Sequence, residues 1–242
     1  MSDITRSLPS PVFGCLVPAL FPDLEHLSVI LNTQHTYYLT DEPFSRKSKA
    51  HRALIRTVNS TQWLTLPVEP ADKKKPLSQV RIKSEAGWPA FFLKALQTSY
   101  GNSRYFDFYQ PEIESDLNHA AQLPSLTAAI QYLNMRLFCY LEAGTFWQDK
   151  TSWINTREFD LIKANQAAAC TPALLIEQRG SYYRKPGRTD GIQIHEAAFA
   201  LPVYRQITDD FHPSCCLLDV LFQYGPYSYQ VVDQLKKRTT GI

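Results

Sequence analysis

The sequence lacks any long apolar run. Its 242 residues are 44% hydrophobic, but no stretch approaches the roughly 18 apolar residues that suggest a membrane span. The segment 1–11 is polar and contains prolines, without the apolar core of a secretion signal. These absences predict a protein that does not span a membrane, and they make the cytoplasm the default location.

Organised cysteine, glycine and charge patterns are also missing. The five cysteines contain no CxxC pair and the histidines have no metal-ligand spacing, so we expect neither a disulfide framework nor a metal site. No glycine-rich phosphate loop is present, so ATP and dinucleotides are not expected, and we predict no cofactor. The net charge is +2 with basic residues spread along the chain, which argues against nucleic-acid binding.

The chain does contain a series of strand-like and helical patterns, which interleave after a lead-in over 1–12. Strands between helices predict an α/β fold, with a mixed sheet flanked by helices. The length fits one domain over 1–242, and the helix-rich middle, 88–169, is either part of that domain or a helical subdomain. Strands are expected at 36–40, 62–68, 79–82, 173–177 and 192–199, and helices at 22–31, 88–100, 126–141, 156–169, 215–224 and 229–237.

Two of the expected helices carry a capping signal at their start. Asn155 followed three residues later by Glu158 is typical of a capping box, in which each side chain binds the other's backbone N–H. Ser214 stands immediately before the apolar run at 215–224 and is a candidate N-cap for that helix.

The C-terminal third carries the strongest motif. Residues 211–226 (FHPSCCLLDVLFQYGP) resemble the signature F-x-P-x-L-S-I-x-D-L-L-F-N-x-G-P of the WbqC-like family. Residues 204–206 (YRQ) are similar to that family's Y-x-Q, and 63–68 (WLTLPV) to its W-L-T-V-P-V strand. Weaker matches at 88–106 and at Pro18 and Pro22 follow in the same order, so the resemblance covers about 16–228 and identifies a divergent member.

The chain departs from the family pattern at several polar positions. The leading H-Q of the family falls on Leu16 and Val17, and the histidine of its W-x-x-x-H falls on Phe92. The family's D-D-V-Q-Y falls on 40–44 and retains one aspartate, while its N-R-N-R-I falls on 51–55 and retains one arginine. If the family histidines are catalytic, the chemistry here has moved to carboxylates or has been lost.

The resemblance implies a role in a bacterial biosynthetic cluster for surface polysaccharide (O-antigen) or a secondary metabolite. It implies acyl or aminoacyl transfer, or amide-bond formation, on a carrier-protein thioester or a nucleotide-sugar intermediate. The alternative is a non-catalytic accessory protein that binds a carrier protein or a synthase. A third class, the glycosyltransferases, would need a nucleotide-sugar motif such as DxD, and the sequence offers only Asp209-Asp210.

Asp219 is the most informative candidate because it lies in the apolar run LLDVLF. A buried carboxylate must be paired or desolvated, so Asp219 either fixes its helix through a partner, for which Arg52 is a candidate, or acts as a general base with a raised pKa. Tyr204 and Gln206 are expected to line the same pocket, the alternative for Tyr204 being simple packing.

A second candidate region follows the strand expected at 36–40. Asp41 stands at the end of that strand, where ligands often bind in α/β sheets. The basic residues behind it offer a clamp for a phosphate or carboxylate, and the alternative is a solvated loop. This basic set comprises Arg46, Lys47, Lys49, His51 and Arg52.

Thiol catalysis is a third possibility. Cys215 and Cys216 are expected at a helix N-terminus, where the dipole lowers a thiol pKa, with His212 close by; the alternative is that both are buried packing residues. A basic and aromatic loop at 182–188 is either a contact for a carrier protein or a solvated loop. The catalytic candidates are therefore Asp219, Asp41 and Tyr204, and the substrate-binding candidates are Arg52, His51, Gln206 and His212.

Overall fold

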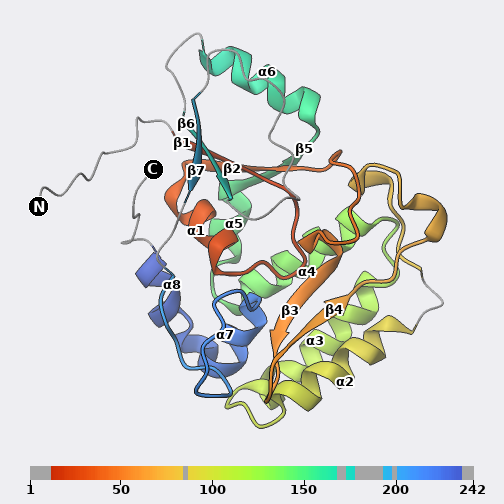
Figure 1. Cartoon of the computed structure of the whole chain (residues 1–242), viewed down its shortest axis with the longest axis vertical. Helices are drawn as coiled ribbons and strands as arrows, with labels where there is room; N and C mark the ends of the chain where they lie inside the picture. The colour runs from red at the N-terminus through yellow and green to blue at the C-terminus, as the bar shows by residue number, and fades with distance from the viewer. Residues whose placement is uncertain (1–11, 84–86, 168–172, 178–192, 198–200, 236–242) are drawn as a thin grey trace, which may run out of the picture.

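The structure is a computed structural model that describes residues 12–83, 87–167, 173–177, 193–197 and 201–235 (Figure 1). In these residues helices alternate with the strands of a parallel sheet, and an antiparallel hairpin stands apart from that sheet. The predicted α/β class is confirmed. Parallel and antiparallel pairing, which we expected within one mixed sheet, are divided between two sheets.

The larger sheet has five parallel strands in the order β5-β2-β1-β6-β7. Parallel neighbours cannot be joined by a tight turn and need a crossover, which helix α1 supplies between β1 and β2. The strands expected at 36–40, 173–177 and 192–199 are confirmed, whereas β1 and β5 were not predicted. The strands span Val12–Leu16 (β1), His35–Leu39 (β2), Thr151–Ile154 (β5), Ala173–Glu177 (β6) and Gln193–Ala197 (β7).

The two faces of this sheet are covered by different helices. Successive side chains of a strand point to opposite faces, so Phe13 and Tyr37 lie on one face and Leu16 and Tyr38 on the other. The first pair packs with Phe159 of α6, and the second pair belongs to the main core. Figure 1 accordingly shows α6 on one side of the sheet and α1 and α5 on the other. These helices span Leu24–Asn32 (α1), Gly144–Lys150 (α5) and Thr156–Ala167 (α6).

Helix α6 begins as its capping signal predicts. The backbone N–H of Asn155 donates to Glu158 Oε2 (3.1 Å), and the N–H of Glu158 donates to Asn155 Oδ1 (2.9 Å). The reciprocal pair satisfies two helix-end donors that would otherwise need water, and the predicted capping box is confirmed.

The hairpin consists of β3 (Arg52–Arg56) and β4 (Thr61–Thr65), so the strand expected at 62–68 is confirmed over a shorter span. The strand expected at 79–82 is wrong, because the chain forms a 3₁₀ turn at Leu77–Gln79 and then makes one isolated bridge between Val68 and Ile82. The Asp72 carboxylate holds this segment, since it accepts from the backbone N–H (3.1 Å) and the Nε (2.9 Å) of Arg81.

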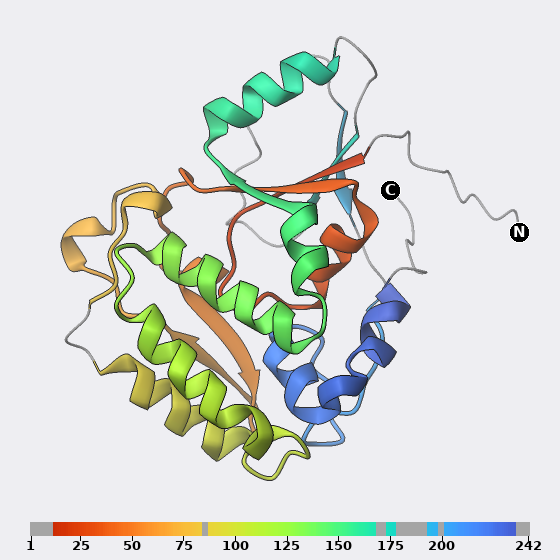
Figure 2. The same ribbon diagram turned by 180° about the vertical axis from the view of Figure 1, so that it is seen from behind.

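Three long helices pack against one another in chain order on one side of the hairpin (Figure 2). The helical stripes expected at 88–100 and 126–141 are confirmed, and α3 between them was not predicted. Buried residues of all three helices share one hydrophobic cluster with β1 and α1, while the division into domains stays a prediction. The helices span Trp88–Tyr100 (α2), Phe106–Ala120 (α3) and Leu126–Tyr140 (α4).

The C-terminal helices are α7 (Leu217–Tyr224) and α8 (Tyr229–Leu235). The prediction that Ser214 caps α7 is wrong, because Cys216 occupies the N-cap position without a side-chain bond. The backbone fixes this start: Cys216 N–H donates to Leu54 O of β3 (2.8 Å), and Leu217 N–H donates to Pro22 O (2.8 Å).

The packing of β1 against α1 gives a testable prediction. A Cβ atom at Gly14 would lie 2.7 Å from Thr36 Oγ1 and 2.9 Å from Val29 Cγ1. We expect Gly14→Ala to lower the free energy of unfolding by about 1–3 kcal/mol, because the added methyl overpacks this contact. Urea denaturation measures the change, with exposed Lys94→Ala as the control. An unchanged midpoint for Gly14→Ala would show that α1 does not lie this close to β1.

Candidate functional site

Asp219 lies in the first turn of α7 and is completely buried, with an exposed fraction of 0%. Its helix neighbours on every side are also buried, so the carboxylate sits inside the main core and not on a polar face. A carboxylate in such a place needs hydrogen-bond donors or a charge partner.

The donors come from a separate stretch of chain that precedes α7. Tyr204 Oη donates to Asp219 Oδ2 (2.7 Å), and Gln206 Nε2 donates to the same oxygen (2.8 Å) and lies 3.0 Å from Tyr204 Oη. Tyr204 and Gln206 are two residues apart, so an extended chain places both side chains on one side. The structure thus brings together the three residues that the sequence grouped around one pocket.

Gln206 also closes the loop that leads into α7. Its Oε1 accepts from the backbone N–H of His212 (2.7 Å), and its Nε2 donates to the carbonyl of His212 (3.1 Å). His212 therefore contributes its backbone to this network, although we expected its side chain to bind substrate. Its Nδ1 is buried without a hydrogen-bond partner among the described residues.

Burial raises the pKa of Asp219 above its ordinary value, despite opposing contributions from the hydrogen bonds of Tyr204, Tyr100 and Gln206 and from the charge of Arg56. Its second oxygen, Oδ1, has no close hydrogen-bond partner among the described residues, although the Tyr100 hydroxyl also acts on the carboxylate as a donor. The result is a buried carboxylate with a raised pKa and one oxygen anchored by two short donors, and such groups occur both at functional sites and in structural networks.

The sequence reasoning missed Arg56 and Tyr100, which flank this network. Arg56, at the end of β3, is 5% exposed and donates from its guanidinium to Ser60 O (2.5 Å) and Thr208 Oγ1 (2.6 Å). Tyr100 Oη accepts from the Arg56 backbone N–H (2.8 Å). The available signal was an arginine that closes the apolar run Ala53–Ile55.

The two cysteines beside Asp219 do not have the properties of a nucleophile. Burial raises the pKa of the Cys215 thiol to about 12, and burial likewise raises the pKa of Cys216 well above its ordinary value. The expected lowering by the helix dipole is wrong, because both thiols are buried and the Asp219 carboxylate adds a further upward contribution for each. The geometry favours the packing interpretation of Cys215 and Cys216.

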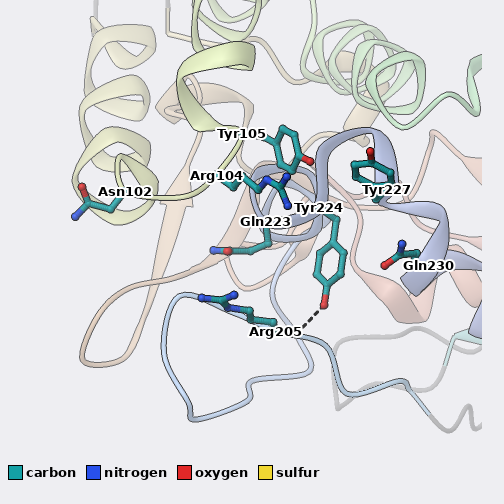
Figure 3. Close-up of a pocket in the computed structure, with 8 residues that line it drawn as sticks. All are labelled: Asn102, Arg104, Tyr105, Arg205, Gln223, Tyr224, Tyr227 and Gln230. Carbon is teal, nitrogen blue, oxygen red and sulfur yellow. Dashed lines mark hydrogen bonds between the residues drawn. The ribbon is translucent and has the colours of Figure 1, made fainter.

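A surface cavity lies next to this network. A cavity of about 250 Å³ is lined by Gln206 together with Arg205 and residues of α2. It shares Asn102, Arg205 and Gln223 with a larger cavity of about 530 Å³, so the two adjoin (Figure 3). Gln206 thus lines the smaller cavity and is also bonded to the buried carboxylate.

Asp41 lies away from this site. Its Oδ1 accepts from the backbone N–H (2.8 Å) and Oγ1 (2.7 Å) of Thr156, so it ties the end of β2 to the first turn of α6. Figure 1 shows α6 and α7 at opposite ends of the molecule. A carboxylate at a helix N-terminus stabilises that helix, and the structure gives Asp41 this role in place of a contact with Asp219.

Three members of the basic set, Arg52, His51 and Lys49, contact other groups of the protein. Arg52 donates to Lys47 O and lies over the Trp63 ring, 4.1 Å from its centroid, and the charge that acts on Asp219 comes from Arg56 instead. Burial lowers the pKa of His51 to about 4, so His51 is neutral at pH 7. Lys49 pairs with Asp23 (2.5 Å). Arg46 and Lys47 are exposed, and the anion clamp that the sequence suggested stays a prediction.

Across the ranges that the structure describes, no group of three or more His, Cys, Asp or Glu side chains is arranged to hold a metal ion. The described helices likewise include none that is long and apolar enough to cross a membrane. The loop at 182–188, a predicted carrier-protein contact, lies outside the described residues.

Fold and site together define an α/β protein with a buried carboxylate network beside a surface cavity. A sequence profile of the WbqC-like protein family matches residues 18–231, and the chain belongs to this family. Comparison with curated proteins and with solved structures gave no match. Leu16 and Phe92, on which we expected the family histidines to fall, are each 1% exposed and lie in the main core.

The raised pKa of Asp219 gives a prediction with a definite sign. A folded-state pKa above the unfolded value means that the native state binds the proton more tightly, so stability falls as the pH rises from about 3.8 through the folded pKa. Asp219→Asn has no such group. We expect its free energy of unfolding, minus that of the unmodified protein, to increase as the pH rises from 4 to 8, as measured by urea denaturation.

Asp107→Asn, at an exposed position of α3, is the matched control and should show no such trend. The raised pKa is supported if the free energy of unfolding of Asp219→Asn, minus that of the unmodified protein, falls as the pH decreases from 8 to 4. A difference that changes in the opposite sense would show that Asp219 is held ionised by its neighbours.

Proposed function

We propose that this protein is a biosynthetic enzyme that transfers an acyl or aminoacyl group to an amine, or forms an amide bond. The donor would be a carrier-protein thioester, or the acceptor a nucleotide-sugar intermediate, as family membership suggests. The single observation that carries the proposal is the Asp219 carboxylate, buried with a raised pKa and joined through Gln206 to an open cavity.

The chemistry requires a base. When an amine attacks a thioester carbonyl, the C–N bond forms, the C–S bond breaks and the thiolate leaves, while the amine must lose a proton. A carboxylate with a raised pKa is suited to take that proton and return it to the thiolate, because its pKa lies closer to the working pH than that of an ordinary carboxylate.

Asp219 is completely buried, whereas Tyr204, which is hydrogen-bonded to it, is 6% exposed, so Tyr204 is the proposed relay for the proton. The Tyr204 hydroxyl, which donates to Asp219 Oδ2, accepts the amine proton as its own proton passes to the carboxylate. Gln206 holds both groups in place and prevents the hydroxyl from turning away. In this proposal Asp219 is the final proton acceptor and Tyr204 the relay.

A second function follows from the same burial. Asp219 is inaccessible in the structure, and the family histidine positions hold Leu16 and Phe92 in the core. Both facts favour a protein that binds the pathway intermediate, or its carrier protein or synthase, without turning it over. In this alternative Asp219 only fixes α7 against the 204–212 loop.

Turnover by the isolated protein separates the two functions. Acetyl and glycyl thioesters of 4′-phosphopantetheine, with nucleotide-linked amino sugars as acceptors, allow the amide product to be measured by mass spectrometry. We expect Asp219→Asn and Tyr204→Phe each to lower kcat by about 10²–10⁴-fold, because positioned proton transfer contributes an effect of that size.

Asp107→Asn serves again as the control, and circular dichroism establishes that each variant is folded. Unchanged kcat in a folded Asp219→Asn would remove the carboxylate from the mechanism. Binding of the substrates without any amide product would favour the accessory function.

A further inference from the structure

The larger cavity beside the Asp219 network has a positive lining. Its volume of about 530 Å³ falls within the range of small-molecule sites. Its lining includes two arginines and no aspartate or glutamate, so an anion entering it meets no repulsion from the wall. The lining residues are Asn102, Arg104, Tyr105, Arg205, Gln223, Tyr224, Tyr227 and Gln230 (Figure 3).

Neither arginine is neutralised within the described part of the chain. Arg104 lies over the ring of Tyr105, 5.2 Å from its centroid, and has no carboxylate partner among the described residues. Arg205 is exposed, and its backbone N–H donates to Tyr224 Oη (3.0 Å). Two guanidinium groups on one cavity without internal counterions are suited to bind a phosphate.

The polar and aromatic side chains between the arginines are held in place. Gln223 Nε2 donates to Ser103 Oγ (3.0 Å), and in Figure 3 the Gln223 side chain lies between Arg104 and Arg205. The Tyr105 ring packs directly on Gly225, where an added Cβ would come within 2.6 Å of it. Such a wall loses little conformational freedom when a ligand binds.

Aromatic surface completes the cavity. Tyr227 is 48% exposed, and Tyr105 and Tyr224 present further rings to the same space. Rings beside a phosphate-binding pair can pack against the organic part of a phosphate ester, such as a nucleobase or a pantetheine chain.

We propose that this cavity binds a phosphate ester, with the phosphate on Arg104 and Arg205 and the organic part against the tyrosines. The inference rests on the proposed function only for which end of the ligand points toward the Asp219 network. Since the two cavities share Arg205 and Gln223, a ligand anchored at the arginines extends past Gln206 toward the Asp219 network. A nucleoside diphosphate and a 4′-phosphopantetheine arm share this chemistry.

The test is isothermal titration calorimetry of the full chain with inorganic pyrophosphate, uridine diphosphate and 4′-phosphopantetheine. We expect at least one probe to bind with a dissociation constant below 1 mM. Arg104→Gln and Arg205→Gln should each weaken that binding about 10-fold and the double variant about 100-fold, because each removes a charge-assisted contact. The probe that binds more tightly of the two organic ones identifies the source of the phosphate.

Arg157→Gln, which removes an exposed arginine from α6, is the matched control and should bind as the unmodified protein does. Absence of binding by all three probes would overturn the proposal, and so would equal weakening by Arg157→Gln and by the double variant. Since both arginines are exposed, folding of the variants is not at issue.

The outcome is independent of the proposed catalysis. Asp219→Asn should retain probe binding even if turnover is lost, because the carboxylate does not line the cavity. Arginine-dependent binding without any turnover would support the site and remove the enzyme proposal. Turnover that survives Arg104→Gln and Arg205→Gln would support the enzyme and remove this site.

Discussion

The position of α7 depends on how the Asp219 carboxylate is satisfied. A carboxylate inside an apolar core is strongly unfavourable unless donors reach it, and here the donors come from Tyr204 and Gln206 on a different stretch of chain. The hydrogen bonds therefore fix the loop before α7 as well as the helix itself. Gln206 extends the constraint by holding the backbone of His212, so one buried charge organises about twenty residues.

The same network links the hairpin and the helical layer to the C-terminal region. Tyr100 of α2 accepts from the backbone of Arg56 in β3, while its ring packs on Phe222 of α7, with centroids 5.0 Å apart. Arg56 in turn binds Thr208 in the loop before α7. Strain in any of these segments would be transmitted to Asp219, because packed interiors adjust poorly to a local change.

Elements with a strong local pattern could be predicted from the sequence, and those defined by distant contacts could not. Helices α2, α4 and α6 carry full apolar stripes or a capping box, whereas β1 is five residues long and owes its strand form to pairing with β2 and β6, far away in sequence. The grouping of Asp219 with Tyr204 and Gln206 could be predicted from the sequence, because an acid in an apolar run needs hydrogen-bond partners. The contributions of Arg56 and Tyr100 could not be predicted, since they arise only when β3 and α2 come into contact.

The positions on which the sequence comparison places the family histidines hold apolar residues. Leu16 and Phe92 are buried in the core, so no titratable side chain stands there, and His51 is held neutral by its burial. Asp219, Tyr204 and Gln206 remain as the polar group that communicates with the cavity. An apolar residue in place of Asp219 alone would leave the buried donors of Tyr204 and Gln206 without an acceptor, which is costly. The hydrogen bonds from Tyr204 and Gln206 already account for Asp219 as the anchor of α7, so a role as a proton acceptor would be a second use of a carboxylate that the fold itself needs.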